Sequence, residues 1–143
     1  MVGFRESIWG TGDPATYYKN GGNPIDILDG SAGSDALAMV VSGNDVYVAG
    51  VSITGSVFNG PQHLIAKYWK NGNPVNLTDG SKWAEAKSIA VSGNDVYVAG
   101  FEENVAGSGN DVAKYWKNGT PVILVDVSKY YNSEAHGIFL APK

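Results

Sequence analysis

The chain has 143 residues, of which 10 are Lys or Arg and 14 are Asp or Glu, so its formal net charge is −4. This charge argues against a nucleic-acid partner held by its phosphates, and no apolar run is long enough to span a membrane as a helix. Hydrophobic residues make up 43% of the chain and Cys is absent, which predicts a globular domain and excludes disulfides, thiolate zinc sites and Cys nucleophiles. The first ten residues lack a basic start and an apolar stretch, so no secretion signal is visible and the sequence assigns no compartment.

The chain repeats one unit three times. The segment VSGNDVYVAG occurs at 41–50 and again at 91–100, and KYWKNG occurs at 67–72 and 114–119, with a weaker copy, TYYKNG, at 16–21. The units span approximately residues 1–33, 34–83 and 84–132 (units 1, 2 and 3 below), and residues 133–143 match the start of a further unit. A repeat of this length is typical of propellers, solenoids or arrays.

In chain order, the first expected strands lie at 15–19 and 24–28. Unit 3 shows all four strands of a unit. Its strands are expected at 87–91, 96–101, 111–117 and 120–125, with a turn at 92–95, a polar loop at 102–110 and an Asn118-Gly119 hairpin. Pro121 fits an outer edge strand, where a missing backbone donor is tolerated. Four antiparallel strands joined in this way predict an all-β protein of propeller blades, with almost no helix.

The segment SIAVSGNDVYVAG, residues 88–100, resembles the blades of NHL-like and related bacterial β-propellers, in which an inner strand precedes a Gly-Asn turn and a "VYV" strand. The KYWKNG and NLTDG segments are similar to those of uncharacterised bacterial propeller-like repeat proteins. The resemblance implies the fold. It implies no activity, because the sequence lacks a Trp-Asp blade ending, a Kelch Gly-Gly pair and a sialidase box.

Both ends of the repeat fall inside a blade. Residues 1–4 align with the second strand of a unit, at 98–101, and residues 136–140 align with a first strand. Three blades close poorly, since propellers typically have four to eight. We therefore expect a six-bladed ring of two chains, in which residues 133–143 of one chain complete the blade begun by residues 1–28 of the other. A nine-bladed trimer and a fragment of a longer repeat protein are the alternatives.

Most recurring side chains in the units have a structural interpretation. The aromatic residues of the third strands are expected to pack between blades: Tyr17, Tyr18, Tyr68, Trp69, Tyr115 and Trp116. Asp29, Asp79 and Asp126 are expected to stabilise turns, and Asn44-Asp45 and Asn94-Asp95 are expected to form the two-residue turns of hairpins. No cofactor or metal motif is present; the Gly-rich stretch 106–109 lacks the context of a phosphate loop.

Two groups of residues are candidates for ligand binding. Asp35, Glu85 and Glu134 align just before the first strands and would surround one mouth of a ring channel, where they could attract a cation or a polyhydroxyl ligand or else lie in solvated loops. The divergent loops on one face carry the aromatic residues Trp83, Tyr130, Tyr131, Trp9 and Phe58, which suit a sugar site or else cap blade interfaces.

The sequence favours a non-catalytic binding or scaffold module that forms a homo-oligomer, with carbohydrate as the first ligand class to test. One alternative is a hydrolase or lyase that uses Glu134 and His136, which lie two residues apart and would share a strand face. His136 occupies a position that varies between units, where Leu37 and Lys87 stand in the other two. A repeat fragment without a ligand of its own is the third interpretation.

Overall fold

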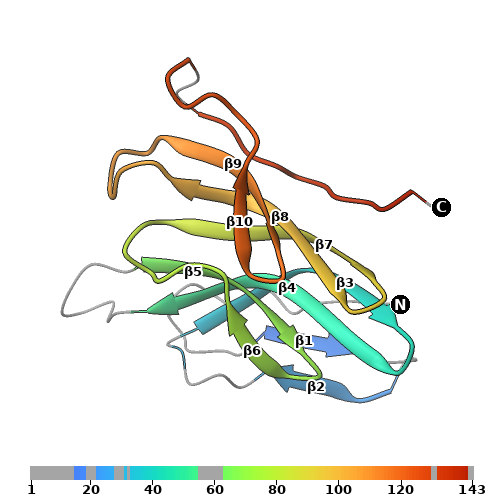
Figure 1. Ribbon diagram of the computed structural model, residues 1–143. Helices are drawn as coiled ribbons and strands as arrows, with labels where there is room; N and C mark the ends of the chain where they lie inside the picture. The colour runs from blue at the N-terminus through green and yellow to red at the C-terminus, as the bar shows by residue number, and fades with distance from the viewer. Residues whose placement is uncertain are drawn as a thin grey trace.

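The computed structural model describes residues 15–18, 22–27, 31, 33–54, 63–129 and 132–141 (Figure 1). These residues form ten β-strands and no helix, and thus no helix that could cross a membrane. The strands are β1 (Ala15–Tyr18), β2 (Pro24–Ile27), β3 (Gly33–Ser42), β4 (Asp45–Thr54), β5 (His63–Lys70), β6 (Asn73–Asn76), β7 (Ala84–Ser92), β8 (Asp95–Glu103), β9 (Asp111–Lys117) and β10 (Thr120–Ile123). The expectation of an all-β chain is confirmed.

Units 2 and 3 each form one antiparallel four-stranded sheet in chain order, β3-β4-β5-β6 and β7-β8-β9-β10. In unit 1, β1 pairs with β2. These two strands correspond to the third and fourth strands of the other units. Pro121 lies in the outer strand β10, as expected, and Pro74 has the same place in the outer strand β6. The strand predicted at residues 1–4 lies outside the described residues. The predicted loop at 102–110 begins too early, because β8 continues to pair as far as Glu103.

The hairpin turns follow local backbone chemistry. Both residues of each Asn-Gly turn have a positive φ, as a tight antiparallel hairpin requires. The φ values are 51° at Asn71 and 83° at Gly72, and 50° at Asn118 and 82° at Gly119. The first hairpin of each full unit turns at Gly43-Asn44 and Gly93-Asn94. The prediction that placed Asp45 and Asp95 inside these turns is wrong by one residue, because Gly43 and Gly93 take the positive φ.

A β-bulge interrupts the first strand pair of both full units at equivalent places. The register shifts between Ala36 and Ala38 in unit 2 and between Ala86 and Ser88 in unit 3. Opposite each bulge a glycine passes very close: a Cβ added to Gly50 or Gly100 would lie 1.9 Å from a backbone carbonyl oxygen. The variable position occupied by Leu37 and Lys87 is therefore the bulged residue, whose side chain a bulge can redirect.

Each junction between successive units is filled by one Trp of the later unit, which confirms the predicted core role for Trp69 and Trp116. Tyr17 is also buried, whereas Tyr18, Tyr68 and Tyr115 are only half-buried. Trp69 is 0% exposed and Trp116 is 1% exposed. Trp69 shares its cluster with unit 1 residues Ala15, Tyr17 and Ile27. Trp116 shares its cluster with unit 2 residues Tyr47, Ala49, Ala66 and Leu77.

The segment 132–141 runs back along β7 in an extended conformation (Figure 1), but it is not a strand. The predicted strand at 136–140 is thus not formed, because among the described residues the segment makes isolated hydrogen bonds and no ladder with a neighbouring strand. It is held instead by individual contacts: the backbone N–H of Ile138 donates to Ser88 Oγ (3.2 Å) and that of Ala135 donates to the Gly100 carbonyl (3.3 Å).

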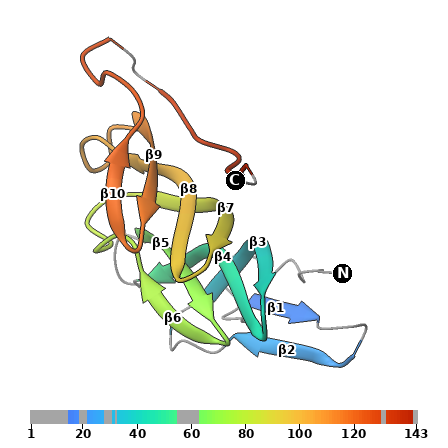
Figure 2. The same ribbon diagram turned by 45° about the vertical axis from the view of Figure 1, so that its right-hand side comes forward.

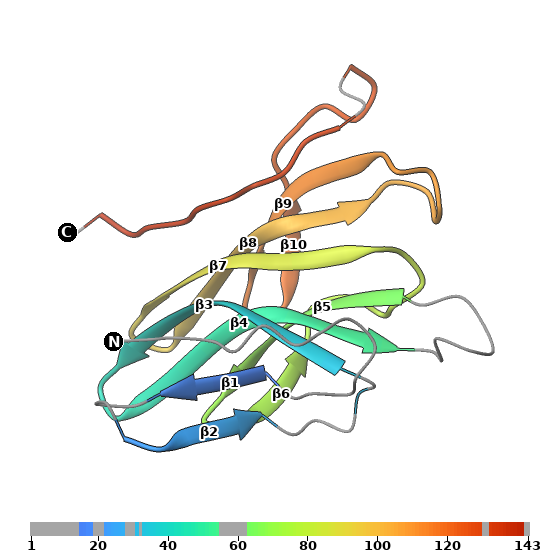
Figure 3. The same ribbon diagram turned by 180° about the vertical axis from the view of Figure 1, so that it is seen from behind.

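The sheets follow one another in the order of the units, as Figures 2 and 3 show from two further directions. β1 packs against β3, and β7 packs against β3, β4 and β5. The described residues of a single chain form an open row of sheets and no closed ring. The row has two edges: a turn edge, with the hairpin turns 43–44, 71–72, 93–94 and 118–119, and a loop edge, with segments 77–83, 104–110 and 124–129.

Candidate functional site

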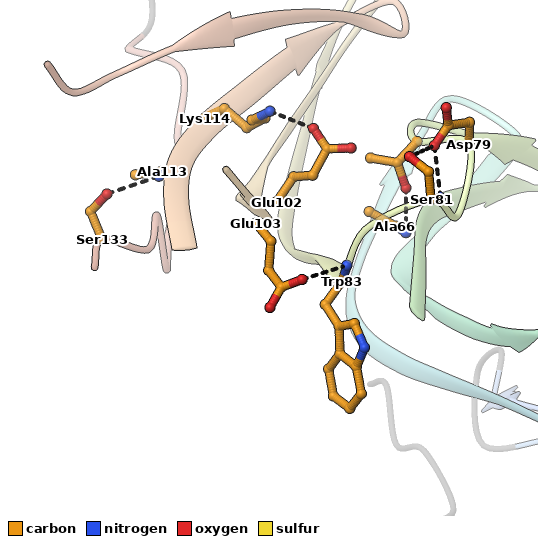
Figure 4. A network of polar contacts seen from close by, with 10 residues as sticks. Ala66, Asp79, Ser81, Trp83, Glu102, Glu103, Ala113, Lys114 and Ser133 are labelled. Carbon is orange, nitrogen blue, oxygen red and sulfur yellow. Dashed lines mark hydrogen bonds and ion pairs between the residues drawn. The ribbon is translucent and has the colours of Figure 1, made fainter. Parts of the chain in front are cut away.

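Trp83 is the one member of the predicted aromatic face that falls among the described residues; Tyr130, Tyr131, Trp9 and Phe58 lie outside them. It stands on the loop edge immediately before β7 and is 44% exposed. Its indole ring points away from the polar contacts around its backbone (Figure 4). Trp83 is therefore an accessible aromatic surface, and its ligand role stays a prediction.

Beside Trp83 lies a buried carboxylate, Glu103, that the sequence did not predict as part of a site. Glu103 is only 6% exposed, and its oxygens accept hydrogen bonds from the backbone N–H groups of Gly107 (2.9 Å), Gly109 (3.0 Å) and Trp83 (3.4 Å). Burial would raise the pKa of Glu103, but these backbone donors outweigh burial and hold the pKa below its ordinary value. The Gly-rich loop 106–109 is thus wrapped around an anion of the chain itself and is not free to bind a phosphate.

Replacing Glu103 with Gln should lower the free energy of unfolding at pH 7 by about 1–3 kcal/mol, because the loop N–H groups lose a charged acceptor. A carboxylate with a lowered folded-state pKa stabilises the protein above its unfolded-state pKa, and this contribution disappears as the pH falls through the folded-state value. The difference in stability between wild type and Glu103→Gln should therefore shrink as the pH falls below the ordinary glutamate pKa of about 4.5. Urea unfolding at a series of pH values measures this difference in stability. A difference that does not change with pH would contradict the role of the ionised Glu103 carboxylate in holding the loop.

The structure brings together two of the three predicted channel-mouth carboxylates. Lys87 Nζ lies 2.7 Å from Glu134 Oε2 and 3.5 Å from Glu85 Oε2. Burial would lower the pKa of Lys87, but the two carboxylates raise it above its ordinary value. Asp35 occupies the equivalent position on β3, opposite Val51. No three His, Asp or Glu side chains in the described ranges gather closely enough to hold a metal ion.

His136 and Glu134 are neighbours, as the sequence predicted. His136 Nε2 lies 3.3 Å from Glu134 Oε2, and the His136 side chain is 73% exposed. The same Glu134 oxygen is also held by Lys87. This arrangement is that of a surface charge cluster, in which the lysine at the bulge of unit 3 binds a carboxylate of the next segment.

Two matching polar clusters lie on the turn edge. Lys70 Nζ is 2.9 Å from Asp45 Oδ2 and 5.3 Å from the centre of the Tyr47 ring, and the Asn71 side chain donates to Asp45 Oδ1 (2.8 Å). Hydrogen bonding to Lys70 and then to Asn71 lowers the pKa of Asp45. Unit 3 repeats the arrangement, with a Lys–Asp distance of 3.1 Å, in the equivalent residues Asp95, Tyr97, Lys117 and Asn118.

Between units 2 and 3 the turn edge is hollowed into a pocket of about 740 Å³. Unit 2 supplies Asp45, Tyr47, Tyr68 and Lys70, and the facing wall from unit 3 includes Asn94 and Asn118. Burial, and then the neighbouring Tyr47, raise the pKa of Tyr68. The pocket lies on the opposite edge from the predicted aromatic face. The sequence did contain a signal for it, since Lys70 and Asp45 recur as Lys117 and Asp95.

The turn interpretation of the recurring aspartates is confirmed for both described examples. Asp79 Oδ1 accepts hydrogen bonds from the backbone N–H (2.8 Å) and the hydroxyl (2.6 Å) of Ser81, and Asp126 and Ser128 repeat this turn (Figure 4 shows the first). These bonds lower the pKa of both carboxyl groups, with the serine hydroxyl as the largest contribution. Asp29 lies outside the described residues.

Comparison of the chain with protein-family models, with curated proteins and with solved structures finds no match.

Proposed function

We propose that the chain is a non-catalytic binding and scaffold module of the β-propeller class, which closes into a ring with a second copy of itself. The observation that carries the proposal is how segment 132–141 sits on unit 3. The backbone N–H of Ala113 donates to Ser133 Oγ (3.0 Å), and at the equivalent place the N–H of Ala15 donates to Ser34 Oγ (2.8 Å). The segment therefore lies against unit 3 as β3 lies against unit 1.

Segment 132–141 occupies the place of the first strand of a unit, but among the described residues no second strand pairs with it. β3 and β7 pair with β4 and β8, whereas segment 132–141 has no strand partner and its Phe139 is 87% exposed. At the other end of the row, β1 pairs with β2 alone among the described strands. Unit 1 of a second copy, including the strand predicted at residues 1–4, would complete a four-stranded sheet over Phe139 and bury both edges.

The same order of units gives the charged residues a role in assembly. Lys87, at the bulge of unit 3, reaches forward to Glu134 in the next segment. His136 is the residue equivalent to Lys87, and Asp35 is equivalent to Glu134. In the closed ring, His136 of one copy would therefore face Asp35 of the other. This arrangement, rather than acid–base chemistry, is our proposal for the Glu134–His136 pair.

Phe139→Asp should weaken self-association by about thirtyfold or more, because it removes a large apolar contact and places a charge in the interface. Light scattering on a sizing column across a dilution series measures it. The wild type is expected at about 30 kDa, twice the 15.1 kDa of one chain, and the variant is expected to dissociate to 15.1 kDa. Since Phe139 is so exposed in the single chain, the variant should stay folded.

Val105→Asp is the matched control, because Val105 is 62% exposed in the loop after β8 and should leave the dimer intact. A further pair tests the register: His136→Glu places two carboxylates together and should weaken the dimer, and adding Asp35→Lys should restore it. A wild type of 15.1 kDa at every concentration, or equal effects of Phe139→Asp and Val105→Asp, would overturn the proposal.

A further inference from the structure

We infer that the turn-edge pocket between units 2 and 3 binds a neutral carbohydrate. Its volume of about 740 Å³ lies in the range of pockets that enclose small molecules. Both walls come from one chain, so the site does not require a second copy and is independent of the proposed ring. It is also separate from the predicted aromatic face on the loop edge.

The charges in the pocket favour a neutral ligand. Asp45 and Lys70 are the charged side chains of its lining, and they bind each other at 2.9 Å. A charged ligand would have to compete with this pair, whereas hydroxyl groups can use the remaining donor and acceptor capacity of both side chains. The pocket thus offers hydrogen-bonding groups of both kinds with little net charge.

Amide side chains extend this polar lining on both walls. Asn44 and Asn94 stand in the two hairpin turns that border the pocket, and among the described residues neither side chain has a protein hydrogen-bond partner. Each amide can therefore donate and accept, as the paired hydroxyl groups of a sugar require.

A tyrosine supplies the apolar surface that a sugar ring needs. Lys70 already covers the ring of Tyr47, with its Nζ 5.3 Å from the ring centre. Tyr68 is only partly buried and lines the pocket, so part of this aromatic side chain is open to a ligand. Packing of an apolar face on an aromatic ring, together with hydroxyl groups bound by amides and charges, defines a carbohydrate site.

Unit 3 contains an internal control for this site. Asp95, Tyr97, Tyr115 and Lys117 repeat the unit 2 wall, with Lys117 Nζ 3.1 Å from Asp95 Oδ2 and 5.4 Å from the Tyr97 ring centre. In the described chain no further hairpin turn faces this copy. Tyr115→Ala or Lys117→Ala therefore loses the same local contacts as its unit 2 twin without changing a residue that lines the pocket.

The test is calorimetric titration of the full chain with three neutral disaccharides: maltose, cellobiose and lactose. We expect at least one to bind, and Tyr68→Ala or Lys70→Ala to weaken that binding by about tenfold. The twins are compared in the Phe139→Asp background, in which no second copy faces unit 3. There, Tyr115→Ala and Lys117→Ala should bind as Phe139→Asp alone does. Circular dichroism verifies that each variant is folded. If Tyr68→Ala unfolds, Lys70→Ala still tests the site, because it changes an exposed side chain.

The inference is overturned if none of the three disaccharides binds, or if each unit 2 variant and its unit 3 twin lose the same affinity in the Phe139→Asp background. Preferential binding of glucuronic acid over glucose would also overturn it, because the site would then select a charged ligand. Loss of the dimer in Phe139→Asp should leave the disaccharide affinity unchanged, which separates failure of this site from failure of the ring.

Discussion

Gly100→Ala is expected to lower the free energy of unfolding by at least about 3 kcal/mol, a large part of the stability of an ordinary domain. The added Cβ would lie 1.9 Å from the Glu85 carbonyl oxygen, 3.0 Å from the Glu85 carbonyl carbon and 3.2 Å from Ala86 Cα. All three atoms belong to the backbone, so no side-chain rotation can relieve the overlap. The two strands must separate or change register at the bulge, which disturbs the inner strand pair of the sheet.

Gly137→Ala is the matched control, since a Cβ at Gly137 meets nothing within 4 Å. Urea denaturation followed by circular dichroism measures both variants. Gly50→Ala should behave as Gly100→Ala does, because its Cβ would lie 1.9 Å from the Asp35 carbonyl oxygen. A loss below about 1 kcal/mol in Gly100→Ala would mean that the close approach does not define the bulge.

The repeat explains why much of the fold could be predicted from the sequence. Asn-Gly pairs and alternating aromatic residues are local signals, and they located the strands and turns of unit 3 to within a few residues. Two copies of the same segment must also pair in the same way, so β3-β4 and β7-β8 share their register and their bulge. The bulge itself could not be predicted, because Gly50 and Gly100 matter only through the opposite strand.

The candidate sites were predicted less well because they depend on contacts between units. Asp45 was expected to serve a turn, and its true partners, Lys70 and Asn71, come from the second hairpin of the unit. The pocket requires, in addition, that Asn94 of the next unit face them. Glu103 accepts hydrogen bonds from the loop 106–109, whose backbone conformation no strand pattern in the sequence predicts. Pairs such as Glu134 and His136 were predictable, since residues two apart on an extended chain lie close together.

Trp116→Ala is expected to lower the free energy of unfolding by about 3–5 kcal/mol, because it leaves a cavity in the junction between units 2 and 3. Trp116 is 1% exposed and packs with both units. Units of a repeat protein are stabilised by their nearest neighbours, so the loss should fall mainly on unit 3. Hydrogen exchange should show faster exchange in β7 to β10 than in β3 to β6.

Trp83→Ala provides the matched comparison, because it makes the same chemical change at a side chain that is 44% exposed. Trp83→Ala should lower the free energy of unfolding by no more than about 0.5 kcal/mol, as other surface substitutions do. Trp69→Ala should resemble Trp116→Ala in size, with the loss at the junction of units 1 and 2, where Trp69 is 0% exposed. Equal losses in Trp83→Ala and Trp116→Ala would show that the units are not held together by these buried tryptophans. A loss in Trp116→Ala spread evenly over β3 to β10 would show that the two sheets unfold as one cooperative body.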